Sequence, residues 1–107
     1  MIEEFLSGWQ TFEEFEKSFY EFWLEHSQSV PPYSYDLLQR ARERLDWTSE
    51  SPSDLERRDG WWDHSDYETW LRKKYRNYAE AVIGQTVKDS RDVEDEMEFL
   101  REVLGRK

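Results

Sequence analysis

Apolar side chains recur at intervals of three and four residues along most of this chain, a spacing that places them on one face of a helix. The clearest run spans residues 12–26, where the apolar face is almost entirely Phe and Trp and many of the other positions are acidic. Thr11 and Glu14 form a T-x-x-E capping box, so the helix is expected to begin there. Pro31 and Pro32 prevent its continuation, because proline lacks the backbone N–H that a helix interior needs.

The same spacing predicts further helices and therefore an all-α fold, a small four- to five-helix bundle with one long irregular loop. The further helices span about residues 2–7, 35–46, 65–84 and 91–104. Gly8 is suited to the turn that ends the first of them. Ser34 is a candidate N-cap for the second, and Ser65 with Glu68 forms another capping box for the third. Residues 85–88 have mild strand character but no partner strand.

The long loop, residues 47–64, exceeds the usual length of an irregular connection in a compact domain. Ser53 and Glu56 can cap one short helical turn within it, which Gly60 then ends. Long loops with their own aromatic side chains are often functional. The other interpretation is that its tryptophans fold back as lids over a small core. They are Trp47, Trp61 and Trp62.

Composition limits the class of protein. A chain of 107 residues forms one domain, residues 1–107, with a single modest core. Only 36% of the residues are hydrophobic and 37% are charged, but 17% are aromatic, and each aromatic side chain buries about 150–250 Å². The absence of cysteine excludes disulfides and thiolate chemistry. We expect a cytoplasmic protein, because the sequence has no apolar run of about 20 residues and no signal-peptide pattern.

Charge narrows the choice of partner. The net charge of −10 argues against binding to nucleic acid or to anionic membranes. It leaves two possibilities: a soluble protein with no charged partner, or a protein whose partner is basic. Residues 1–26 contain seven acidic side chains and one basic one. We interpret the bases of the helix at 65–84 as counter-charges for the helix at 12–26. They are Arg72, Lys73, Lys74 and Arg76.

No pattern for catalysis or for a cofactor accompanies these features. His26 lies on the apolar face of its helix, and His64 stands between Asp63 and Ser65. Neither histidine has the spacing of a zinc site, and the acidic runs do not match a calcium-binding loop. We therefore expect a protein that is not an enzyme and that uses no metal and no cofactor.

The opening of the chain has a more specific pattern: a short helix, a Ser-Gly turn and a second helix with spaced aromatic residues. It reads Ile2-x-x-Phe5-Leu6-Ser7-Gly8-x-x-Thr11-x-x-Glu14-Phe15-Glu16-x-x-Phe19-x-x-Phe22-Trp23. This pattern resembles the opening of the colicin D immunity-like family, which includes immunity proteins of bacteriocin and contact-dependent growth-inhibition systems. The resemblance covers about residues 2–23 and returns weakly at Asp46 and at residues 66–71. Residues 47–64 do not match well, and there we expect toxin specificity to vary.

The resemblance implies a cytoplasmic antidote that plugs the basic active-site cleft of a cognate nuclease toxin, often a tRNase, partly by mimicking the negative charge of RNA. Asp46 and Asp66 are the acids that match the family near its binding face. The loop between them supplies further candidates by its position alone. They are Asp54, Glu56, Asp59 and Asp63. Trp61 and Trp62 are candidate anchors, since buried tryptophan often dominates the energetics of an interface.

Two other functions remain open at this stage. One is a nucleic-acid mimic that inhibits a restriction or CRISPR effector, although the bases of the helix at 65–84 interrupt the continuous acidic surface that such a mimic usually has. The other is a structural helical adaptor with no charged target. The sequence specifies neither the toxin and its substrate nor the oligomeric state.

Overall fold

The computed structural model describes residues 1–84 and 90–105, and it confirms the all-α prediction. The helices are α1 (Ile2–Leu6), α2 (Phe12–His26), α3 (Pro32–Leu45), α4 (Asp54–Arg58), α5 (His64–Ile83) and α6 (Ser90–Phe99). A 3₁₀ turn, Ser27–Ser29, follows α2, and a π-helical turn, Leu100–Leu104, follows α6. The weak strand pattern at residues 85–88 lies outside the described residues.

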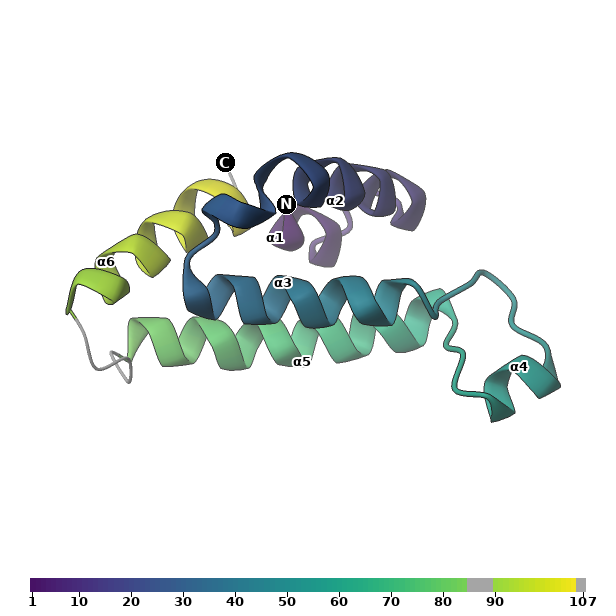
Figure 1. Cartoon of the computed structure of the whole chain (residues 1–107). Coiled ribbons are helices and arrows are strands. Elements are labelled where there is room, and N and C mark those ends of the chain that lie inside the picture. Colours follow the sequence, from purple (N-terminus) through teal and green to yellow (C-terminus); the bar gives the residue numbers. More distant parts are fainter. Residues whose placement is uncertain (85–89, 106–107) are drawn as a thin grey trace.

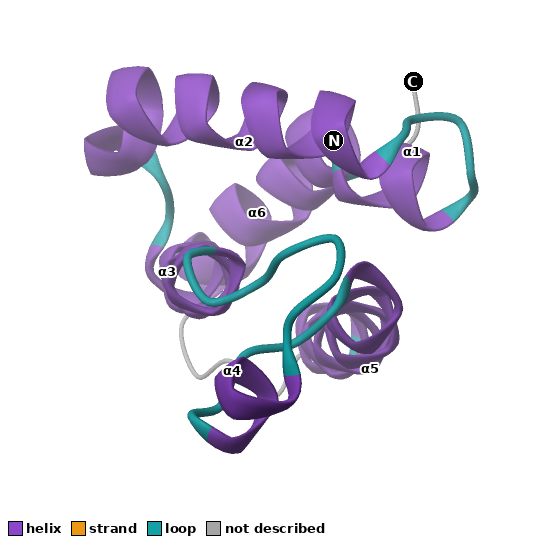
Figure 2. Cartoon of the chain, turned by 90° about the vertical axis from the view of Figure 1, so that its right-hand side faces the viewer, coloured by secondary structure: helices purple, strands orange, loops and turns teal. Residues whose placement is uncertain are grey.

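The helices form a two-layered bundle (Figures 1 and 2). Helices α3 and α5 lie side by side and antiparallel, and α1, α2 and α6 cover one side of this pair (Figure 1). The short helix α4 stands apart from both layers at one end, so the molecule is elongated, with extents of 47 × 25 × 24 Å. Within the described ranges, each helix is too short or too polar to span a bilayer.

Aromatic side chains fill the core, as the composition required. Phe15, Phe19 and Tyr67 are fully buried between the two layers. Phe5 of α1 stacks on Phe15 with ring centroids 4.4 Å apart, which holds α1 against α2. The Tyr67 hydroxyl donates a hydrogen bond to the Ala41 carbonyl oxygen at 3.0 Å, so this buried phenol is satisfied.

The predicted ends of the first two helices are confirmed. Thr11 Oγ1 accepts a hydrogen bond from the Glu14 N–H, and the Glu14 carboxylate accepts one from the Thr11 N–H, both at 3.1 Å. Gly8 has a φ of +82°, which glycine adopts at little cost. The Gly8 and Trp9 N–H groups donate to carbonyl oxygens of α1, so this turn is a Schellman motif.

The predicted start of α3 is wrong. The helix begins at Pro32, two residues before the expected cap, because proline at the first helical position needs no N–H partner. Ser34 is fully buried inside the helix instead of capping it. Two N–H groups of the first turn, which have no partner within the helix, are satisfied by Glu96 of α6, whose carboxylate accepts from Tyr33 at 2.6 Å and from Ser34 at 3.0 Å.

The capping box predicted for α5 is also displaced. The helix begins at His64, and Asp63 is its N-cap. Asp63 Oδ1 accepts from the Asp66 N–H at 2.8 Å, and Asp66 Oδ2 accepts from the Asp63 N–H at 3.3 Å. Aspartate at both positions therefore takes the role expected of Ser65 and Glu68, two residues earlier in the chain.

Candidate interaction site

The segment between α3 and α5 leaves the bundle and returns to it through a closed neck. The Ser49 N–H donates to the Trp62 carbonyl oxygen, and the Trp62 N–H donates to the Trp47 carbonyl oxygen, each at 3.0 Å. Thr48 and Trp62 thereby form an isolated parallel bridge. We call residues 47–63, which this bridge joins and which include α4, the projection.

Local hydrogen bonds give the projection a defined shape in the absence of a core of its own. The predicted Ser53–Glu56 capping box is present, with bonds of 3.2 and 3.0 Å. Gly60 ends α4 with a φ of +100°, and its N–H donates to the Arg57 carbonyl oxygen at 3.1 Å. The Trp61 N–H donates to the Glu56 carbonyl oxygen at 3.0 Å, which completes a second Schellman motif. All residues from 53 to 60 are exposed, so these contacts order a segment that adds little to the core.

Arg44 of α3 holds the base of the projection. Its guanidinium lies over the Trp62 ring, 3.7 Å from the centroid, and donates a hydrogen bond to the Gly60 carbonyl oxygen. Partial burial lowers the pKa of Arg44 from its ordinary value. Trp62 also meets Trp70 edge to face at 5.9 Å and packs against the core. Trp62 is therefore a lid on the bundle, as one of the two interpretations of the loop expected.

The apolar surface of the projection comes from other side chains. Trp47 is 49% exposed, and its ring packs against that of Trp61 at 5.4 Å. Leu55 of α4 is 69% exposed. The candidate site derived from the sequence contains neither Trp47 nor Leu55. Trp47 directly follows α3, a position equally typical of a lid over the core. Leu55 lies in a five-residue helix, which is too short for its periodicity to identify the side that faces outward.

The acids matched to the family lie at the two ends of the projection and have partners within the chain. Asp46 accepts hydrogen bonds from the Tyr20 hydroxyl and, at 3.2 Å, from Arg42. Burial, followed by the hydrogen bond to Asp46, raises the pKa of Tyr20. Asp66 belongs to the α5 capping box and lies 3.4 Å from Arg57. Both carboxylates thus have structural roles.

Arg57 joins α4 to the start of α5. Its guanidinium lies 2.9 Å from Asp63 and 3.4 Å from Asp66. The hydrogen bond from the Asp66 N–H and the contact with Arg57 lower the pKa of Asp63. The same contact, chiefly with Asp63, raises the pKa of Arg57. These groups are exposed to solvent, so the contact orients α4 and adds little stability.

Three carboxylates of the projection remain directed to solvent. Glu50, Asp54 and Asp59 are exposed and form no ion pair with the described residues. Glu56 is exposed as well, but its carboxylate is used in the capping box. Residues 46–66 contain seven acidic and two basic residues, so the segment is acidic as a whole. The structure therefore combines exposed apolar side chains with unpaired acids on one ordered protrusion.

Among the described residues, no ion pair joins a base of α5 to a carboxylate of α2, so direct pairing does not support the interpretation of these bases as counter-charges. Arg72 pairs with Glu68 of its own helix at 2.9 Å and donates to the Leu6 carbonyl oxygen of α1 at 2.9 Å. Two arginines of α3 likewise pair locally, Arg40 with Asp36 of the same helix and Arg42 with the C-cap residue Asp46. The carboxylates of α2 consequently remain on the surface as a second acidic region.

The two histidines lie apart. His64 stacks on Phe12 with centroids 3.7 Å apart, and His26 is exposed beside Glu25 at 3.6 Å. Among the described residues, no group of three or more potential ligands is arranged to hold a metal ion. The arrangement at the projection suits recognition by shape and charge. Comparison of the chain with protein-family models, with curated proteins and with solved structures finds no match.

Proposed function

We propose that this protein is an immunity protein that binds a cognate nuclease toxin, a tRNase, and blocks its basic active site. The observation on which the proposal rests is the projection: an ordered, acidic, partly apolar protrusion at the end of a helical bundle. A convex acidic element suits a concave basic cleft, and nuclease active sites are basic because they bind a polyanion.

Preorganisation supports a binding role for the projection. The bridge at the neck, two capping interactions and Arg44 order a segment in which residues 53–60 are all exposed. Ordering a loop costs about 1–2 kcal/mol of conformational entropy per residue. A loop already ordered before binding does not incur this cost at the interface. Order in residues that contribute little to the core therefore favours a role in recognition over that of a structural adaptor with no charged target.

The residues on which the proposal depends most differ from those expected from the sequence. Glu50, Asp54 and Asp59 supply the unpaired charge, and Trp47 and Leu55 supply the apolar contact. The matched acids Asp46 and Asp66, with Asp63, hold the projection in place through their internal partners. A resemblance to the colicin D immunity-like family remains part of the proposal and rests on the pattern of residues 2–23.

The test is capture followed by inhibition. Tagged protein is used to capture basic proteins at low salt from the organism that encodes it, and each captured protein is purified and incubated with tRNA. We expect one captured protein to cleave tRNA, and one equivalent of the immunity protein to stop the cleavage. A captured restriction or CRISPR effector would establish the nucleic-acid mimic instead, and the absence of any basic nuclease would overturn the proposal.

Matched variants assign the inhibition to the projection. Glu50→Lys with Asp59→Lys reverses two unpaired charges and leaves every side-chain capping hydrogen bond of the projection in place, and inhibition should weaken by about tenfold or more. Glu13→Lys with Glu21→Lys makes the same change in net charge on α2. Equal losses in the two double variants would show that the total charge, not the projection, governs binding.

A further inference from the structure

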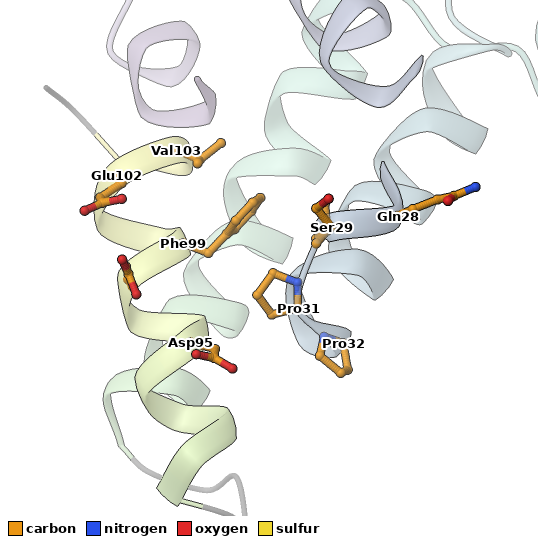
Figure 3. A pocket seen from close by; sticks show the side chains of 10 residues that line it. Gln28, Ser29, Pro31, Pro32, Asp95, Phe99, Glu102 and Val103 are labelled. Atoms are coloured by element: carbon orange, nitrogen blue, oxygen red, sulfur yellow. The ribbon is translucent and has the colours of Figure 1, made fainter. Parts of the chain in front are cut away.

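Two adjoining shallow hollows lie beside α6 and the π-helical turn that follows it, and we call them together the trough. Helix α6 lies at the end of the molecule opposite α4 (Figure 1). The first part of the trough is a hollow of about 380 Å³ between α6 and the segment that joins α2 to α3. Figure 3 shows the Phe99 side chain extending from its helix into the space between that helix and the segment that carries Ser29, Pro31 and Pro32. Val30, Pro32 and Val103 complete an apolar floor.

The trough continues into a second hollow of about 390 Å³ between the end of α6 and α2. Glu102 and Val103 line both hollows. Phe22 lines the second, and its ring meets that of Phe99 at 6.1 Å, so the apolar floor is continuous from one hollow to the next. Gln10 also lines the second hollow, and its side-chain oxygen is buried without a hydrogen-bond donor among the described residues.

Carboxylates border this floor. Asp95 and Glu98 of α6 and Glu102 of the π-helical turn follow one another at intervals of three and four residues and are all exposed. Glu4 of α1 adds a fourth carboxylate at the second hollow. Within the described part of the chain, neither lining contains a lysine or an arginine. The N-terminal ammonium of Met1 also lies at the second hollow and donates to the Val103 carbonyl oxygen at 2.8 Å, and His26 lines the same hollow. The trough therefore combines apolar contact with charged side chains that are mainly carboxylates.

We propose that this trough is a second interaction surface, which binds a short basic segment of a partner protein in which cationic and apolar residues alternate. An extended segment places alternate side chains on opposite sides, with about 6.6 Å between residues i and i+2. This spacing is close to the turn repeat of about 5.4 Å along the acidic side of α6. Apolar side chains on one side of the segment contact the floor, and the flexible stems of lysine or arginine on the other side bend toward the border, where their charged ends meet the carboxylates.

A second copy of this chain is a poorer occupant, because its net charge of −10 opposes association with an acidic trough. The proposal does not depend on the nuclease-inhibitor function, because the trough and the projection share no residue.

The probe is the acetylated, amidated peptide Lys-Leu-Lys-Leu-Lys, titrated into the isotopically labelled protein and followed by amide chemical shifts and by calorimetry. We expect shifts concentrated at α6, at residues 28–32 and at the ends of α1 and α2. Replacing both leucines of the peptide with serine should weaken binding about tenfold, since two apolar side chains then lose their contact with the floor. Equal binding of the two peptides would overturn the proposal, because simple charge attraction would explain it.

A charge-matched pair of protein variants completes the test. Asp95→Asn with Glu98→Gln and Glu102→Gln should weaken binding of the leucine peptide about tenfold or more. Glu13→Gln with Glu21→Gln and Glu80→Gln removes the same charge from exposed positions outside the trough and should change binding by less than about threefold. Equal effects of the two triple variants would reject the trough. Neither result bears on the proposed inhibition by the projection, which is tested separately.

Discussion

The carboxylate of Glu96 accepts a hydrogen bond from the Ser34 N–H at 3.0 Å, across 62 residues of sequence. It also accepts from the Tyr33 N–H and from the Ser34 and Tyr78 hydroxyls. Pro31, the N-cap residue of α3, offers no side-chain acceptor. A side chain of the last helix therefore caps the third, and it does so in a fully buried position. The contact determines where α6 docks.

Removing this carboxylate should destabilise the whole fold. We expect Glu96→Ala to lower the free energy of unfolding by about 3 kcal/mol, because buried donors of α3 lose their acceptor. Urea denaturation followed by circular dichroism measures the change. Glu98→Ala, on the exposed side of the same helix, is the control and should cost less than about 0.5 kcal/mol. Similar losses in both variants would mean that helix propensity, not the cap, is responsible.

Substitution at Gly60 should loosen the projection alone. Its φ of +100° is unfavourable for a side chain, so Gly60→Ala costs about 1–2 kcal/mol in the turn after α4. Because residues 53–60 bury little, amide hydrogen exchange should accelerate at Gly60 and Trp61 while the midpoint of global unfolding hardly changes. Ser51→Ala, an exposed change in the same segment, should leave exchange unaltered. A large fall in global stability with unchanged local exchange would contradict this.

The carboxyl of Asp63 should make stability depend on pH in the acid range. Its pKa in the folded protein is lowered, so the unfolded chain binds a proton more readily. Its stabilising contribution is complete above the unfolded pKa and is lost as the pH falls through the folded pKa. The stability difference between the natural protein and Asp63→Asn should thus be largest near neutral pH and shrink below about pH 4.

Urea unfolding of both proteins between about pH 7 and pH 3 measures this difference. Asp59→Asn is the control, because it removes one negative charge at the end of α4 and leaves the cap of α5 unchanged. A difference for Asp63→Asn that stays constant or grows toward low pH would show that the carboxylate is not stabilised by the Asp66 N–H and Arg57.

Arg44 should not be replaceable by lysine. Lysine keeps the charge but lacks the planar group that covers Trp62 and reaches the Gly60 carbonyl oxygen. We expect Arg44→Lys to lower stability by about 1–2 kcal/mol and to shift tryptophan fluorescence, since Trp62 becomes more hydrated. Arg40→Lys, on the same helix but paired only with exposed Asp36, is the control. Identical fluorescence in both variants would contradict the role of Arg44 in covering Trp62.

The local rules of helix formation predicted much of this fold. The Thr11–Glu14 and Ser53–Glu56 boxes and the Gly8 turn were expected, because each depends on residues within a few positions of one another. The start of α3 was not, because its cap is Glu96, and a contact across 62 residues leaves no trace in a local pattern.

The candidate site was predictable in position but not in detail. The length and aromatic content of residues 47–64 identified the segment correctly as a distinct feature. The pairing of Arg57 with Asp63 and Asp66, six and nine residues away, depends on how α4 folds back toward α5. Those contacts determine which acids have no partner. Reversing the charges of Asp63 and Asp66 would therefore disturb the start of α5 instead of testing recognition.

The closed neck has a consequence for how this protein can diversify. Because Ser49 and Trp62 join the two ends of the projection, residues between them can be exchanged or lengthened without moving α3 or α5. Doubling the length of a flexible loop costs only about 0.6 kcal/mol in closure entropy. Under the proposed function, sequence changes within the projection can therefore alter binding specificity while the two layers of helices retain their stability.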